Sequence, residues 1–199
     1  MGEQVERDFT ARAEERRVLM GQFPLIQQIS IEMDLRDMVI ETWVRLWRES
    51  GYRDIGEAPN ILSQQGGDET LVRHTNAVVR IARSAAKEIQ KIYHIPLNLD
   101  CLLAGAFLHD VDKLVVYRRN GNLVELSELG HRVPHGEYGA RIAEQIGLPP
   151  EVVNIIASHT PVRPRAKPAS VEAVLVAYCD LAVYQSYRLI NGMSVYEFS

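Results

Sequence analysis

The sequence has few cysteines, no long apolar run and no cluster of basic side chains. Its two cysteines, Cys101 and Cys179, stand alone in apolar stretches, which favours buried free thiols over a disulfide. No apolar run approaches the length of a membrane span, and the charged N-terminal segment lacks the apolar core of a signal peptide. We therefore expect a cytoplasmic protein with no membrane partner.

An excess of positive charge is also absent. The 22 lysines and arginines stand against 26 aspartates and glutamates, for a formal net charge of −4. This balance argues against a stable nucleic-acid partner, because binding the phosphate backbone needs a basic surface. The chain is 46% hydrophobic and 24% charged over 199 residues, which is typical of a globular domain with a sizeable core.

Apolar periodicity predicts a mostly helical chain. Leu35, Met38, Trp43 and Leu46 belong to a series at three- and four-residue steps, which predicts an amphipathic helix that ends at Gly51. Residues 51–67, rich in Gly, Pro and polar side chains, are typical of a loop. Further helices are expected from Asp68 to about Tyr93, from Asn98 or Asp100 through the apolar run before His109, from His135 to Gly147, from Pro150 to about His159, and from Ser170 to about Ile190.

One segment departs from the helical pattern. The stretch LVVYRRNGNLVEL has β-rich residues on each side of Asn120-Gly121, which predicts a small hairpin. The fold class is thus all-α with one hairpin, divided into an N-terminal helical extension and loop, 1–67, that packs on a domain of residues 68–199. The helix with Trp43 and Trp47 could pack on that domain, cover a site as a lid or form a homodimer contact, and core packing is favoured.

Several polar residues lie where the pattern predicts burial. Asp180 lies within an apolar helix, and His109 and Asp110 close the apolar run 102–108. A buried carboxylate is costly unless an arginine or a metal neutralises it. A divalent cation could satisfy His74, His109, Asp110 and Asp180 together, and such nitrogen and oxygen donors suit Mn, Fe, Co, Ni or Zn, with Mg also open.

A single histidine or aspartate in a helix is more often a cap, a surface residue or a hydrogen-bonded core group. We keep that interpretation for His94 and His131. For the remaining histidines and aspartates, their joint occurrence in this order along the chain outweighs that interpretation. The ordered set resembles the HD superfamily, in which a first His, an adjacent His-Asp pair and a late Asp lie on separate helices. The resemblance covers about residues 68–190 and implies an HD-type helical bundle whose metal ligands are His74, His109, Asp110 and Asp180.

Many members of that superfamily carry two further histidines in the interval that His135 and His159 occupy here. The resemblance then implies two metals, with Asp110 between them and His135 and His159 on the second. Lys113 matches the lysine of the subgroup motif His-Asp-x-Gly-Lys, although Asp112 replaces the glycine. The HD-GYP subgroup is disfavoured because no Gly-Tyr-Pro follows.

The resemblance implies a metal-dependent phosphohydrolase that acts on a nucleotide or another small phosphoester through metal-activated water. Asp110 and Lys113 are the expected catalytic residues, with Lys113 on the substrate phosphate; alternatively, Lys113 is a solvated residue at a helix end. No substrate-binding residue is singled out. Arginines that could contact an anionic substrate are Arg118, Arg119, Arg132, Arg163 and Arg165.

Two other functions stay open at this point. Some HD members with the six-residue set hold two irons and use oxygen to cleave carbon bonds, and the same donors would serve them. The chain could also be a binding module that keeps the fold without catalysis. The complete ligand set argues against that module, because such buried polar residues are costly to retain.

Overall fold

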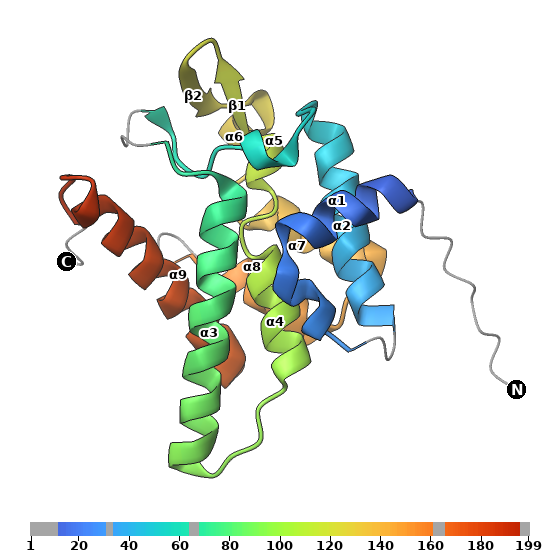
Figure 1. The fold of residues 1–199 in the computed structure, drawn as a ribbon, viewed down its shortest axis with the longest axis vertical. Helices are drawn as coiled ribbons and strands as arrows, with labels where there is room; N and C mark the ends of the chain where they lie inside the picture. The colour runs from blue at the N-terminus through green and yellow to red at the C-terminus, as the bar shows by residue number, and fades with distance from the viewer. Residues whose placement is uncertain (1–11, 31–33, 64–67, 161–165, 196–199) are drawn as a thin grey trace, which may run out of the picture.

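The computed structural model describes residues 12–30, 34–63, 68–160 and 166–195. This part of the chain is a bundle of helices with one two-stranded antiparallel sheet at one end (Figure 1), which confirms the predicted fold class. The elements are α1 (Ala13–Gln22), η1 (Pro24–Gln28), α2 (Leu35–Ser50), η3 (Ile55–Glu57), α3 (Leu71–Tyr93), α4 (Leu99–Leu108), α5 (Lys113–Val116), β1 (Tyr117–Asn120), β2 (Leu123–Leu126), α6 (Glu128–Arg132), α7 (Glu137–Ile146), α8 (Pro150–Ser158) and α9 (Val171–Ile190).

Helix α4 lies at the centre of the bundle. It packs against α2, α3, α8 and α9 (Figure 1), and every residue from Cys101 to Leu108 is buried. A helix that is apolar on all sides needs neighbours on all sides, so this arrangement follows from the sequence. Asn98 caps the helix through its side-chain oxygen, which accepts from the Cys101 amide at 3.0 Å.

The contact between α4 and α8 is unusually close at Gly105. A Cβ on this residue would lie 2.6 Å from both Cγ2 and Cδ1 of Ile155, so only glycine fits. His109 follows Gly105 by four residues, and His159 follows Ile155 by four residues. Residues four apart lie on the same helix face, so this contact places both histidines at the same end of the interface.

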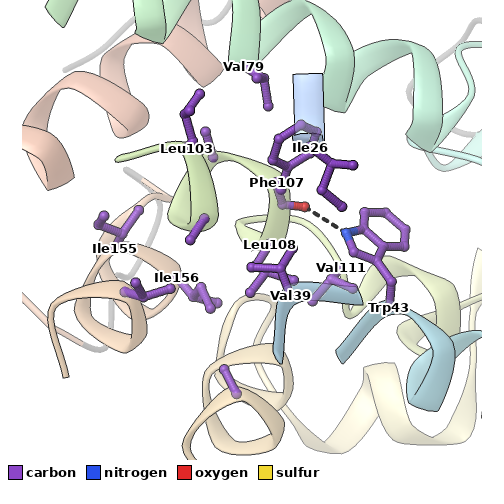
Figure 2. Close-up of a cluster of buried hydrophobic side chains, with 14 of the residues drawn as sticks. Ile26, Val39, Trp43, Val79, Leu103, Phe107, Leu108, Val111, Ile155 and Ile156 are labelled. Atoms are coloured by element: carbon purple, nitrogen blue, oxygen red, sulfur yellow. Dashed lines mark hydrogen bonds between the residues drawn. The ribbon is translucent and has the colours of Figure 1, made fainter. Parts of the chain in front are cut away.

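Helix α2 contacts the centre of the core through Trp43. The indole is fully buried, its Nε1 donates to the carbonyl oxygen of Phe107 at 3.0 Å (Figure 2), and its ring lies 4.7 Å from that of Phe23. Of the three positions considered for this helix, these contacts favour packing on the core. The division of the chain after residue 67 stays a prediction.

The start of α3 differs from the prediction. The helix begins at Leu71, and the hydroxyl of Thr70, rather than the carboxylate of Asp68, accepts from the Arg73 amide at 3.3 Å. Thr70 pairs with Pro59 in a β-bridge, so the chain is still extended at residues where a helix was predicted. The Asp68 amide donates instead to the hydroxyl of Tyr187 at 3.0 Å.

The hairpin is present but shorter than predicted. Residues 114–116 lie in α5, where the Val116 amide donates to Asp112 O at 2.9 Å, and Leu114 and Val116 are buried. Asn120 pairs with Leu123, so the turn residues are Gly121 and Asn122 rather than Asn120 and Gly121. Gly121 has φ +60°, and a two-residue turn with glycine first matches the twist of the strands.

Both cysteines are buried free thiols, as predicted. Within the described residues, no helix combines the length and the apolar character that crossing a membrane requires.

Candidate metal centre

His109 and Asp110 directly follow the last residue of α4, and both are buried. His109 Nδ1 lies 2.8 Å from the carbonyl oxygen of Ala106. Because a carbonyl oxygen only accepts, we assign the proton of a neutral His109 to Nδ1, which leaves a lone pair on Nε2. Nε2 lies 3.3 Å from Asp110 Oδ2.

His159 repeats this arrangement at the end of α8. Its Nδ1 lies 2.7 Å from the carbonyl oxygen of Ile156, three residues earlier, and the ring is buried. Its Nε2 lies 3.4 Å from Asp110 Oδ1. Two helix ends therefore direct histidine Nε2 atoms at the two oxygens of one carboxylate.

Helices α3 and α9, which pack along each other, supply His74 and Asp180. His74 is buried, and its Nε2 lies 2.9 Å from Asp180 Oδ1 and 3.3 Å from Asp110 Oδ2. Asp180 Oδ1 also lies 3.7 Å from His109 Nε2. These distances join His74, His109 and Asp180 on the Oδ2 side of Asp110.

His135 reaches the other side of Asp110 from the segment that precedes α7. Its Nε2 lies 2.7 Å from Asp110 Oδ1 and 3.2 Å from His159 Nε2. Its Nδ1 lies 2.8 Å from Asp112 Oδ1. With 26% of its side chain exposed, against 15% for Asp180, it is the most exposed of the six predicted ligands.

Asp110 thus lies between two groups of donor atoms. Within each group the donor atoms all lie within 4.8 Å of one another, and each group could hold a metal ion. One group is His74, His109, Asp110 and Asp180, and the other is Asp110, His135 and His159. The structure therefore brings together all six residues that the sequence singles out.

The hydrogen bonds leave this centre short of positive charge. His109 and His159 each use the Nδ1 proton on a carbonyl, so in the neutral rings the Nε2 lone pairs face carboxylate oxygens. The Nε2 atoms of His135 and His159 also face each other at 3.2 Å. Additional protons or a metal must compensate, and these nitrogen and oxygen donors fit a divalent first-row metal.

The pKa values express the same imbalance. Burial alone would lower the pKa of His109, but the Asp110 carboxylate raises it to about 10. Burial is likewise outweighed at His135, where Asp112 and Asp110 raise the pKa to about 9. Burial would raise the pKa of Asp110, but Lys113 and His109 hold it well below its usual value. Carboxylates that stay ionised and favour positive charge on the neighbouring histidines would also favour a divalent cation.

Lys113 is buried, so the interpretation as a solvated helix-end residue is wrong. Its Nζ lies 2.7 Å from Asp110 Oδ2 and 2.9 Å from Asn60 Oδ1. Asn60 Nδ2 in turn donates to Glu69 Oε2 at 3.3 Å, and that oxygen lies 3.6 Å from His74 Nδ1. A buried polar chain therefore connects Lys113 with the far side of His74.

The sequence did not identify Asn60 and Glu69, which are 2% and 4% exposed. Both lie in or next to a stretch that looks like a polar loop, and nothing in its composition predicts burial. Their backbones pair, with the Asn60 amide donating to Glu69 O at 2.9 Å, which holds the stretch against α3. In the sequence, Asp112 is notable only because it replaces the glycine of the motif His-Asp-x-Gly-Lys. In the structure it is fully buried.

The other singled-out residues lie outside the centre. Arg118 pairs with Glu125 at 2.7 Å, and Arg119 donates to the carbonyl oxygen of Glu57 at 3.2 Å. Among the residues singled out in the sequence, His94, His131 and Arg132 are exposed, which agrees with the surface interpretation of the two histidines. Arg163 and Arg165 lie outside the described residues.

A cavity of about 600 Å³ lies beside the hairpin, and its lining includes none of the six predicted ligands. The lining residues are Leu62, Ser63, Arg118, Leu123, Val124, Glu125, Leu126 and His131. This cavity is therefore lined by other residues than the candidate metal centre.

Comparison with known proteins agrees with this geometry. The chain is 31% identical over 150 residues to the dihydroneopterin 2',3'-cyclic phosphate phosphodiesterase of Methanocaldococcus jannaschii, and the match covers 64% of this chain and 60% of that protein. The chain thus matches less than two thirds of the length of this curated relative. No solved structure gives a significant match. The family model described as HD domain matches residues 71–182, more than half of the chain and a span that includes all six predicted ligands, so the chain belongs to the HD domain family.

Proposed function

We propose that the chain is a metal-dependent phosphohydrolase that hydrolyses a small phosphoester. The observation that carries this proposal is the position of Asp110, whose two carboxylate oxygens face separate groups of donors. A carboxylate between two such groups can bridge two metals, an arrangement that recurs in enzymes of phosphoester hydrolysis. Membership of the HD domain family supports the same reaction class.

In this proposal, His74, His109, Asp110 and Asp180 bind one metal, and Asp110, His135 and His159 bind a second. The donor types suit Mn, Fe, Co, Ni or Zn, with Mg also open. When bound, the metals lower the pKa of a water ligand and offset negative charge on a phosphoryl oxygen.

The residues of the chain hold this arrangement in place. The carbonyl oxygens of Ala106 and Ile156 fix the rings of His109 and His159, so that their Nε2 atoms need no reorientation. Lys113 holds Asp110 Oδ2 at 2.7 Å, and its ammonium offsets part of the negative charge of the carboxylates. The expected contact of Lys113 with a substrate phosphate stays a prediction.

For the substrate, we propose a phosphodiester with a small organic group, and a 2',3'-cyclic phosphate is the first choice. The named activity of the Methanocaldococcus jannaschii relative supports this choice, and nucleoside 2',3'-cyclic phosphates carry the same cyclic phosphodiester group. We keep a cytoplasmic location as part of the proposal, and a homodimer stays open.

The test combines metal analysis with an activity screen. Protein purified without added metal or chelator is analysed for its metal content, then assayed on nucleoside 2',3'-cyclic phosphates and bis(p-nitrophenyl) phosphate with each of the six metals. We expect metal-dependent hydrolysis in the wild type and none in Asp110→Asn. About two equivalents of iron, with oxygen consumption and no hydrolysis, would favour the di-iron oxygenase instead. No binding of any metal would contradict the proposal.

A further inference from the structure

Asp112 is a fully buried carboxylate that does not belong to either group of metal donors. One of its oxygens, Oδ1, lies 2.8 Å from His135 Nδ1. The other, Oδ2, accepts from the Gly136 amide at 2.8 Å and from the Gly139 amide at 3.4 Å. A single side chain therefore contacts both His135 and the first turn of α7.

The amide contacts fix the orientation of this carboxylate. Gly136 and Gly139 lie at the N-terminus of α7, where backbone amides have no partner within the helix and favour a negative charge. Both amides point at Oδ2, which leaves Oδ1 directed at His135. The helix end thus determines which face of the carboxylate the imidazole meets.

The orientation of the His135 ring depends on the contact with Asp112 more than the other histidine rings depend on any single contact. It is the most exposed of the six residues, and it lies in the segment before α7 rather than at the end of a buried helix. Among the described residues, its other polar partners are Asp110 and His159, which both belong to the second metal group. Without Asp112, none of the polar contacts that the described residues make with this ring would come from outside that site.

We propose that Asp112 is a positioning residue that keeps the proton of His135 on Nδ1 and its Nε2 free to bind the second metal. The inference rests on the proposed two-metal function. Metal occupancy of the second site then depends on Asp112. Occupancy of the site formed by His74, His109 and Asp180 does not.

Asp112→Asn separates the two contacts of the carboxylate. Asparagine has one acceptor oxygen and one NH₂ donor. Because the Gly136 and Gly139 amides both require an acceptor, the oxygen takes the Oδ2 position and the NH₂ group faces His135 Nδ1. Nδ1 must then accept, so the neutral ring carries its proton on Nε2, and Nε2 must give up that proton before it can bind a metal. The helix keeps its cap while the ligand is weakened.

The experiment titrates full-length, metal-free protein with Mn²⁺ and measures stoichiometry and affinity for the wild type, Asp112→Asn, His135→Ala and the double variant. The wild type should bind two ions. Asp112→Asn should keep the first ion and bind the second about 10- to 100-fold more weakly, the usual effect of removing such a partner of a ligand. The double variant should match His135→Ala, because Asp112 acts through His135. A purely structural role would add a further loss in the double variant.

Different results of this titration would contradict the proposed function and the role of Asp112. If the wild type binds no metal, the proposed function fails and this inference fails with it. If the wild type binds two ions and Asp112→Asn binds both with unchanged affinity, only the inference is overturned.

A measurement on the wild type does not depend on how the variant folds. In zinc-loaded, ¹⁵N-labelled protein, a long-range ¹H–¹⁵N spectrum should show His135 protonated at Nδ1 and coordinated through Nε2. Coordination through Nδ1, or an Nδ1 without a proton, would overturn the proposal.

Discussion

Gly105→Ala should destabilise the protein by forcing α4 and α8 apart. The new Cβ would lie 2.6 Å from Cδ1 and Cγ2 of Ile155 and 2.8 Å from the Cβ of Ile155. Overpacking of this kind costs about 1–3 kcal/mol, and three such contacts place this case near the upper end. Alanine regains about 1 kcal/mol of helix propensity over glycine. The net loss in the free energy of unfolding is therefore about 2 kcal/mol.

For a chain of this size, that loss corresponds to a decrease in Tm of about 4–8 °C. Thermal unfolding followed by circular dichroism in EDTA measures it without a contribution from bound metal. Because His109 and His159 follow the contact by one helical turn, Mn²⁺ affinity should also fall. Gly21→Ala is the matched control: this glycine is in a helix, and nothing lies within 4 Å of its added Cβ. Its Tm should stay the same or rise slightly.

A Tm for Gly105→Ala equal to or above that of the wild type would refute the reasoning. It would mean that α4 and α8 do not approach as closely as described, and the convergence of His109 and His159 would lose its structural explanation. A decrease in both variants would instead mean that any added methyl group on a helical glycine is harmful. Only a decrease confined to Gly105→Ala supports the close contact.

Three further outcomes are expected. Trp43→Phe leaves the carbonyl oxygen of Phe107 without the indole donor, and urea unfolding should show a loss of about 1–3 kcal/mol; an unchanged midpoint would contradict that hydrogen bond. Asp110→Ala should abolish metal binding and hydrolysis together, because both donor groups share this carboxylate, and full metal occupancy would contradict the assignment. Burial raises the pKa of the Cys101 thiol to about 11, so alkylation in the native protein at pH 8 should be far slower than in denaturant and should accelerate as the pH rises, and equal rates would contradict its burial.

The sequence predicted the helices well because their physical causes are local. The uninterrupted apolar run of α4 could only lie at the centre of a bundle, and Ser170 caps α9 as expected, accepting from the Ala173 amide at 3.1 Å. The start of α3 was missed because it depends on a β-bridge between Pro59 and Thr70, which is a contact between separate segments. Local propensity contains no information about such a pairing.

Three of the six candidate ligands were predictable for a related reason, whereas His135 and His159 rested on the resemblance to the HD superfamily. Polar residues such as His109 and Asp110 at the end of an apolar run must be buried, and burial demands a partner. Glu69 and Asn60 carry no such signal, because a polar residue beside a loop is ordinarily solvated. Only the fold places them next to His74 and Lys113. The direct donors were therefore visible in the sequence, whereas the groups that hold them were not.

In the proposed function, the position of the candidate ligands also implies that metal binding and folding are linked. The carboxylates of Asp110 and Asp180 and the histidines around them converge only when α3, α4, α8 and α9 pack together. The unfolded chain cannot reproduce that convergence, so a metal bound to the centre stabilises the folded state by an amount that grows with metal concentration. Without metal, the carboxylates favour protonation of His74, His109 and His135, whose pKa values they raise, and metal binding would release those protons. The centre that the helices assemble is therefore itself one of the interactions that hold the helices together.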